Sequence, residues 1–483
     1  MRASPAIAGL AMVLAGCASV AEFRPRGDGG WSAERRTEEL GRLARRAGVD
    51  FGASLESTPP LPQALDLATA LAMAAKGNRR IAISERELEG VEQQVHDVRG
   101  RLLPATVGSG RYTWYTDAQR NRVQLPVALT GAAAGGGTSF KIRDSDVGTL
   151  NGTMTLPLDV SGELRHALAA AEAGYRGAEA RLWATTLDQQ LTVVRAYFDL
   201  LEAERLRGVT EKNVVVDREQ LKNAEAKFQS GRLTKNQLLV VQVALQTAEQ
   251  ELDRRALAIS QARFALNQAI GADVNAPTEP ADVTERPVVP SVEEALRVAY
   301  AENPLLHERL EEQQRLEETA RSLARSRFPR LAAGAAIDYS NSQLLEPRDL
   351  GSGFVGFNWD LDTSGQREAE IAEARIAVER NRLEVERQLR ELEAVVRSTH
   401  QAAAERLTAL ATAENAVGQA EENLRIRREQ FDVGRASSED VLDAQALLST
   451  ERATQASALY QAHVRMAELR SLMGRGAAGE TPR

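Results

Sequence analysis

Residue types that perform catalysis or bind metal ions do not form a recognisable motif in this sequence. The segment 360–365, Asp-Leu-Asp-Thr-Ser-Gly, begins like a calcium-binding loop, but its twelfth position is Ile371, where such a loop needs glutamate. The five histidines show no spacing typical of metal ligands, and there is no phosphate-binding loop or nucleophile elbow. We therefore expect no enzymatic activity, no metal and no cofactor, and we interpret 360–365 as a turn into a helix.

A single cysteine is the residue best suited to covalent modification. Cys17 has no disulfide partner within the chain. It follows a basic start, a short apolar stretch at 6–14 and small residues, which is typical of a secretory signal peptide. The ending Leu-Ala-Gly-Cys resembles the lipobox of bacterial lipoproteins, which implies lipidation of Cys17. Because no aspartate follows the cysteine, this resemblance favours the outer membrane. An ordinary signal peptide with an incidental cysteine is the alternative.

Composition excludes several classes of protein. The chain has 483 residues, of which 43% are apolar and 27% charged, so it is not intrinsically disordered. Only 4% are aromatic, which suits long helices with narrow seams better than a large globular core. The net charge of −8 argues against nucleic acid as the main partner. A mean hydropathy of −0.34, with no run of 18 apolar residues, excludes a helical membrane protein.

The chain is an internal duplication. Matching residues lie 225 positions apart in the early part of each copy and 203 positions apart later, so one copy contains 22 additional residues. Three signatures recur: Asn78 and Asn303; Asp-x-Ser-Gly at 159–162 and 362–365; Phe-x-x-Gly-Arg at 228–232 and 431–435. The excess falls between about 117 and 148, where an Ala-Gly run at 132–137 predicts a long flexible loop.

Each copy is expected to have the order helix, strand, loop, strand, very long helix, turn, helix. Apolar periodicity predicts one opening helix from about 64 to 101 and its equivalent from 292 to 327, each ending before a proline. Strict alternation of apolar residues then predicts strands. These lie at about 105–116, 149–159, 331–341 and 352–362. Strands of this length can cross a bilayer when tilted.

Long helices should follow each pair of strands, at about 161–229 and 364–430. Apolar residues spaced four and three apart form a heptad seam in the first of them: Leu187, Leu191, Val194, Phe198 and Leu201. A helix of about 69 residues would span roughly 100 Å. The return helix at 234–270, stacked end to end on the opening helix, would have nearly the same length. Each copy would therefore supply one continuous rod and one composite rod.

Four strands per chain cannot close a barrel, and an open sheet edge in lipid is prohibitively costly. Several copies must therefore each contribute four strands. A trimer would give a 12-stranded β-barrel above 12 helical rods. Aromatic residues near the strand ends would lie at the membrane interfaces. They are Tyr112, Trp114, Tyr339, Phe357 and Trp359.

The duplicated order, the paired asparagines and the Phe-x-x-Gly-Arg signatures resemble the TolC-like outer membrane factors over about 60–475. The lipobox resembles that of the NodT-type lipoprotein branch. This resemblance implies a homotrimeric outer-membrane channel that continues as an α-helical tunnel across the periplasm. It further implies a periplasmic adaptor protein and an inner-membrane transporter, of RND type, as partners.

The family carries its adaptor-docking tips on the two helix hairpins. The matching positions here are Gly231, Arg232, Leu233, Gly434 and Arg435; both glycines would also be explained as ordinary turn residues.

Acidic side chains form the periplasmic gate of the family. The matching positions are Asp440 and Asp443. The family's partner arginine is replaced by Ala436, with Arg435 one place earlier. Charges on a solvated helix face are the alternative interpretation.

We therefore expect a passive exit duct for small toxic compounds. It would lie in the bacterial outer membrane, anchored by lipid and extending into the periplasm, with no nucleic acid as a partner. Protein export through such a duct, or a coiled-coil structural lipoprotein without a pore, are alternatives. The expected divisions are a signal peptide at 1–16, a lipidated linker at 17–60, repeats at 61–275 and 291–475 joined by a linker at 276–290, and a tail at 476–483.

Overall fold

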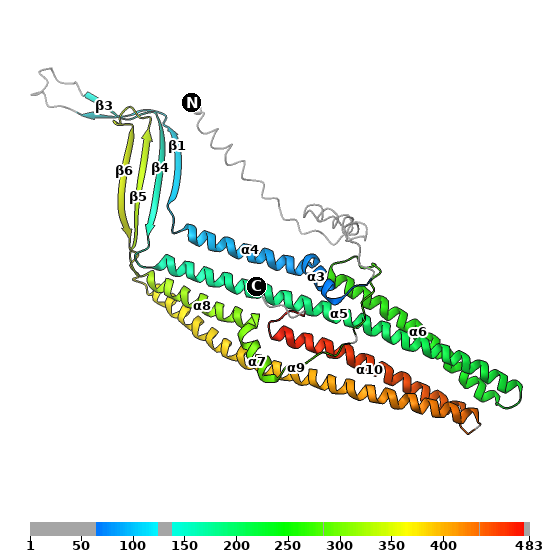
Figure 1. Ribbon diagram of the computed structural model, residues 1–483. Helices are drawn as coiled ribbons and strands as arrows, with labels where there is room; N and C mark the ends of the chain where they lie inside the picture. The colour runs from blue at the N-terminus through cyan, green and yellow to red at the C-terminus, as the bar shows by residue number, and fades with distance from the viewer. Residues whose placement is uncertain (1–63, 124–137, 284, 434, 478–483) are drawn as a thin grey trace, which may run out of the picture. The chain divides into compact units, whose positions relative to one another are not determined.

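The computed structural model describes residues 64–123, 138–283, 285–433 and 435–477 (Figure 1). The expected signal peptide, Cys17 and Gly434 lie outside the described residues. Within them, the chain is mainly helical with one four-stranded antiparallel sheet, in the fold class that the sequence predicts. Among the helices described, none combines the length and apolar character needed to span a membrane.

The elements repeat in the same order in both copies. The first copy contains α3 (Leu67–Gly77), α4 (Arg79–Gly100), β1 (Ala105–Trp114), β4 (Asp146–Leu158), α5 (Glu163–Gln229) and α6 (Lys235–Ile270). The second contains α7 (Val292–Glu302), α8 (Pro304–Arg325), β5 (Arg330–Ser340), β6 (Asp349–Asn358), α9 (Gln366–Asp432) and α10 (Ser438–Leu472).

The prediction of one unbroken opening helix per copy is wrong. Asn78 is extended, with ψ of 116°, and its Oδ1 accepts a hydrogen bond from Arg80 N at 2.9 Å, which starts α4 afresh. Asn303 does the same before α8, where Pro304 lacks a backbone N–H. Each asparagine also donates to a carbonyl at the end of the return helix, Ala269 or Leu472. The break is therefore a junction where the return helix ends and α4 or α8 begins. Because the opening helix is divided at this junction, the composite rod is shorter than predicted.

The 22-residue excess is only partly a loop. Its flanks pair as an antiparallel hairpin of β2 (Gln119–Val123) and β3 (Thr138–Arg143). The prediction of a flexible loop rested on the Ala-Gly run, which lies outside the described residues. Flanking residues such as Phe140 and Ile142 have high strand propensity, and this favours extended pairing.

The two longest helices begin at matching glycines. Gly162 and Gly365 have φ of 80° and 75°, and α5 and α9 each run for 67 residues. The preceding aspartates accept hydrogen bonds from amides of the first turn, Asp159 from Leu164 N and Asp362 from Arg367 N. Because a carboxylate satisfies free amides and complements the helix dipole, the Asp-x-Ser-Gly signature marks a helix start, as predicted for 360–365.

The core lies along the middle of α5. This helix packs against α4, α6, α8 and α10, while α9 packs against α8 and α10. The predicted heptad seam is confirmed, since four of its residues are buried and Leu191 packs against them. Tyr197 and Leu200 widen the seam beyond a strict heptad. This cluster thus joins helices of both copies through α10, and α9 packs in two further clusters.

The sheet order is β1-β4-β5-β6, with every neighbouring pair antiparallel (Figure 1). The strand from the first copy, β4, pairs with β5 from the second, from Leu158 opposite Leu331 to Thr149 opposite Ser340. The outer strands β1 and β6 each have one edge without a partner strand among the described residues.

Candidate functional site

The register of the four strands sorts their side chains onto two faces. Leu150 lies opposite Gly110 and Tyr339, and Met154 lies level with Ala335 and Gly353. Because cross-strand partners share a face, one face of the sheet is apolar. Its largest side chains are also exposed, with 60% of Leu150, 66% of Ile337 and 76% of Val355 accessible. An exposed apolar face of this extent suits lipid rather than water.

The predicted interface aromatics lie at the two ends of this apolar face. Tyr112 and Trp114 are at the end of β1, with ring centroids 6.4 Å apart, and Tyr339 lies at the same end of the sheet. Phe357 lies at the other end, opposite Leu331. Positions 331 and 339 of β5 are eight residues apart, or ~26 Å along the strand. That span suits the ~25 Å apolar band of a membrane strand, with aromatic girdles at both edges.

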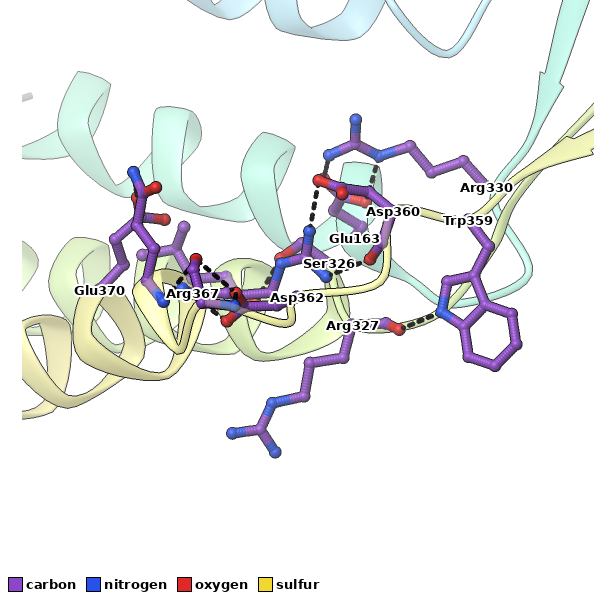
Figure 2. Close-up of polar contacts among 12 residues, drawn as sticks. Glu163, Ser326, Arg327, Arg330, Trp359, Asp360, Asp362, Arg367 and Glu370 are labelled. Carbon is purple, nitrogen blue, oxygen red and sulfur yellow. Dashed lines mark hydrogen bonds and ion pairs between the residues drawn. The ribbon is translucent and has the colours of Figure 1, made fainter.

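The fifth aromatic, Trp359, lies just beyond β6. Its Nε1 donates a hydrogen bond to the carbonyl of Arg327 at 3.1 Å, and 52% of the residue is exposed (Figure 2). The indole therefore ties the strand end to the segment after α8 while presenting its ring to the surroundings. An indole with a satisfied N–H and an exposed ring suits a membrane interface.

The opposite face of the sheet carries most of the polar side chains of the strands, together with Val107, Leu350 and Phe354. Asn151 donates from Nδ2 to the Asp338 carboxylate, and Ser109 lies opposite Asn151 on β1. Thr153 and Thr155 of β4 point the same way as Asn151 because side chains alternate along a strand. The first face suits lipid, and the second is the more polar of the two.

Charged side chains join the strands to the helices where the two meet (Figure 2). Arg330 at the start of β5 binds Glu163 at the start of α5, with Nε and Nη2 at 2.9 and 2.5 Å from its oxygens. Arg367 of α9 binds the carbonyl and carboxylate of Asp360 at 2.8 and 2.7 Å. Burial raises the pKa of the Asp362 carboxyl, but hydrogen bonds from Ser364 and Arg367 hold this pKa below its ordinary value. Hydrogen bonds and ion pairs thus join the strand ends and helix ends of both copies at this junction.

The first hairpin tip is a tight glycine turn between α5 and α6. Gly231 has φ of 72°, and Arg232 N donates to Lys227 O at 2.9 Å, which satisfies a carbonyl at the end of α5. Thr234 and Gln237 form a reciprocal capping box that starts α6. Arg232 is exposed and Leu233 half-buried. Both interpretations of the tip, as a turn and as a docking surface, remain compatible with this geometry.

The second tip has the same construction on its described side. Arg435 N donates to Gln430 O at 2.8 Å, and Val433 is 69% exposed. Contacts between the two hairpins lie close by, with Lys227 Nζ 3.4 Å from the centroid of the Phe431 ring. The sequence signature Phe-x-x-Gly-Arg marked Phe431 but not this contact.

A cluster of polar side chains farther along the hairpins was also not predicted from the sequence. Asn213 Oδ1 of α5 accepts hydrogen bonds from Gln445 Nε2 and Ser449 Oγ of α10, at 3.1 and 2.7 Å. No periodic pattern distinguishes such polar residues from solvated ones until the helices are placed.

The two acids proposed for the gate differ in their surroundings. Asp440 accepts from the backbone N and the Oγ of Ser437, both at 2.7 Å, and these bonds hold its pKa below the ordinary value. It is therefore a helix-capping residue at the position where Gln237 caps α6. Asp443 is exposed on α10. Within the described part of the chain, no group of three metal-ligating side chains converges.

A sheet with one lipid-facing and one polar face, fused to long paired helices, defines the class of an outer-membrane channel protein. Comparison with known proteins agrees. The model of the family "Outer membrane efflux protein" matches residues 70–272 and 295–475. None of the curated proteins has a matching sequence.

Solved structures share the fold. The CmeC outer membrane channel of Campylobacter jejuni is similar with a TM-score of 0.71 and 15% identity, covering 86% of this chain and 87% of that one. The outer membrane protein VceC of Vibrio cholerae has a TM-score of 0.71 and 17% identity, covering 85% and 96%. The open state of the MtrE channel of Neisseria gonorrhoeae has a TM-score of 0.68 and 17% identity, covering 86% and 91%.

Because the family model spans most of the chain, this protein belongs to the outer membrane efflux protein family. It is an outer-membrane efflux protein and is located in the outer membrane. Its family and its structural relatives are channel proteins rather than enzymes.

Proposed function

We propose that three copies of this chain assemble into a passive exit duct for small toxic compounds. The observation that supports it best is the four-stranded sheet, which has an exposed apolar face and two edges, β1 and β6. Backbone groups at an open edge cost several kcal/mol each in lipid, so the edges must pair. Pairing β6 of one copy with β1 of the next continues the antiparallel alternation and closes a ring.

Barrel size favours three copies. Eight strands from two copies would enclose a lumen filled by side chains, whereas 12 strands leave an open polar lumen. The polar face that carries Asn151 and Asp338 would line this lumen. The paired helices would continue it as a 12-rod tunnel.

The hairpin tips meet the periplasmic adaptor in this proposal. Arg232 and Arg435 are exposed beside the tip turns, and together with Gly231, Leu233 and Gly434 they would form the docking surface. An inner-membrane transporter of RND type would supply the energy, since the chain itself is proposed to catalyse nothing and to bind no cofactor. Asp443, repeated three times, would form a ring of negative charge that favours cations. Asp440 would add to it from its capping position.

Lipidation of Cys17 would hold the first repeat at the membrane. The predicted signal peptide at 1–16 and linker at 17–60 precede the first repeat at 61–275, and the second follows at 291–475. If the lipid anchor is present, labelled palmitate should be incorporated by the wild type and lost in Cys17→Ser.

Purified full-length protein in planar bilayers tests the channel. We expect discrete single-channel conductance steps, together with a trimer by native mass spectrometry. A monomer with no conductance would refute the duct and favour a coiled-coil lipoprotein. Export of a protein instead of drugs in cells supplied with the cognate transporter would change the substrate class only.

A further inference from the structure

The β2–β3 hairpin has no counterpart in the second copy, and the four-stranded sheet is complete without it. β4 runs directly into α5 at its Leu158 end, so its Asp146 end, where the hairpin joins, is the end away from the helices. Tyr112 and Trp114 lie at this end of β1. The hairpin therefore begins where the aromatic edge of the apolar face stops.

The hairpin is anchored at its base by a buried carboxylate. Asp144 accepts hydrogen bonds from Ser342 Oγ at 2.6 Å and Gln343 N at 3.1 Å, both in the turn between β5 and β6. Lys141 Nζ lies 2.6 Å from Asp144 Oδ1. Tyr115 N also donates to Ser145 O at 2.6 Å. The base is thus fixed to both copies.

The strands of the hairpin have two unlike faces. Phe140 and Ile142 alternate on one face of β3, and each is 54% exposed. The other face is basic, because Lys141 and Arg143 alternate with them and Arg120 lies directly opposite Lys141. The two strands together contain four basic residues and no acid.

This charge pattern is unfavourable for the hairpin alone. Like charges directly opposite each other on two strands are destabilising. Lys141 has Asp144 as a partner, but no ion pair within the described part of the chain involves Arg120 or Arg143. Arg143 instead lies over the Tyr115 ring, 5.1 Å from its centroid. Two exposed guanidinium groups are available for an anion from outside the chain.

We propose that the β2–β3 hairpin binds the phosphorylated glycolipid of the outer leaflet, with Arg120 and Arg143 contacting its phosphates and Phe140 and Ile142 contacting its acyl chains. Guanidinium groups bind phosphate through paired, charge-assisted hydrogen bonds, and an apolar face on the other side of the hairpin suits a hairpin lying at the boundary between headgroups and chains. A membrane lipid supplies both chemistries in one molecule. This inference rests on the proposed membrane placement of the four strands.

The test uses full-length detergent-solubilised protein and bisphosphorylated lipid A as the probe, with affinity measured by microscale thermophoresis. We expect Arg120→Gln/Arg143→Gln, which leaves the Lys141–Asp144 bond intact, to weaken binding at least tenfold. Phe140→Ser/Ile142→Ser should also weaken it. The matched control Arg80→Gln/Arg86→Gln, on exposed α4, should bind as the wild type does.

Three outcomes would overturn the proposal. They are wild-type affinity in the Arg120/Arg143 variant, an equal loss in the α4 control, and displacement of lipid A by inorganic phosphate at the same concentration. The last would indicate a site for soluble anions. Single-channel conductance of the Arg120/Arg143 variant separates this proposal from the channel, because conductance is expected to persist whether or not lipid binding is lost.

Discussion

At the scale of single residues, the two copies keep one hydrogen bond while changing the side chain that makes it. Tyr197 OH lies 2.7 Å from Ala281 O and 3.0 Å from Leu65 O, so its one proton is shared between two carbonyls, of which Leu65 lies before α3. At the matching positions His400 Nε2 lies 2.9 Å from Pro290 O, before α7. A carbonyl can only accept, so the histidine must carry its proton on Nε2. The requirement at this position is for a donor, which two different rings satisfy.

Asp217 is a position where the two copies differ, and the difference destabilises the fold. It is 8% exposed on α5, and no hydrogen bond or ion pair joins it to another described residue. Burial raises the pKa of its carboxyl above the ordinary value. The matching residue of the second copy is Ala420, which packs in the core between α9 and α10. The first copy therefore has a carboxyl group where the second copy has a methyl group.

We predict that Asp217→Ala stabilises the protein, and more at high pH than at low pH. A carboxyl whose pKa is raised on folding favours the folded state when protonated, so the penalty grows as pH rises from its unfolded value through the folded one. At pH 8 the gain should be about 1 kcal/mol, at the low end of the cost of a buried polar group without a partner, because the carboxylate oxygens keep some contact with solvent. Thermal unfolding in detergent at pH 4 and pH 8 measures it.

The control for this substitution is Asp253→Ala on the exposed surface of α6. It removes the same atoms and should gain only the ~0.5 kcal/mol of helix propensity. Equal stabilisation by the two variants, or an Asp217→Ala effect independent of pH, would contradict the prediction.

At the scale of elements, the hairpin tips are the places where exposed charge meets a rigid turn. We predict that Arg232→Glu/Arg435→Glu reduces drug resistance at least fourfold in cells that also produce the adaptor and pump. Three-fold assembly would reverse six charges at the docking end, and like-charge contacts across an interface are strongly disfavoured. Minimum inhibitory concentrations, with outer-membrane fractions to confirm protein levels, provide the measurement.

Arg254→Glu/Arg397→Glu makes the same change of charge on the shafts of the hairpins. Both arginines are exposed and far along their helices from the glycine turns. This variant should retain resistance. If it loses as much resistance as the tip variant, general charge rather than docking at the tips is responsible.

Much of the element order was predictable from sequence, for reasons the structure makes plain. The strands were predicted because Leu150, Met154 and Leu156 alternate with polar residues, and the long helices because apolar residues recur at heptad spacing. The helix breaks were missed, although Pro304 is a signal for the second one. The first break depends on Asn78. Its side chain favours a helix start over helix continuation only when the folded chain also brings the carbonyl of Ala269 within hydrogen-bonding distance.

The site could be predicted less completely. Alternation identified the aromatics Tyr112 and Phe357, but which residues share a face required the register of β1, β4, β5 and β6. Contacts between hairpins, such as Lys227 with Phe431, join positions about two hundred residues apart. The β2–β3 hairpin was not predicted, because the glycines of the same segment indicated a loop. Pairwise tertiary contacts of this kind leave no periodic signal.

At the scale of the whole molecule, one sheet of four strands must find its partners in other copies. An even number of antiparallel strands leaves β1 and β6 running in opposite directions, so the same edge-to-edge pairing can repeat around a ring. Neighbouring strands in a sheet lie ~4.8 Å apart, within the reach of a disulfide. Cys17 is the only native cysteine, so introduced cysteines report on this pairing without interference once it is replaced by serine.

We predict that Gly108→Cys on β1 cross-links to a cysteine on β6 of another copy. A Cβ at Gly108 or Gly351 meets no atom within 4 Å, and one at Gly353 meets only Gly334 O at 3.9 Å, so these substitutions leave the sheet intact. Since the register between copies is set by barrel shear, Gly108→Cys is combined in turn with Gly351→Cys and Gly353→Cys, which lie on the same face of the sheet as Gly108. Oxidation should give covalent dimers and trimers for one pair on denaturing gels.

Pairs that place one cysteine on the central strand β4, such as Gly152→Cys with Gly351→Cys, test the specificity of this edge contact. Both neighbours of β4 belong to its own chain, so no cross-linked multimer should form. Multimers from the β4 pair would indicate nonspecific collision. Their absence from every β1–β6 pair would show that the edges do not close a ring between copies. A ladder that stops at three chains, rather than continuing, would identify the ring as closed, because an open edge would keep adding copies.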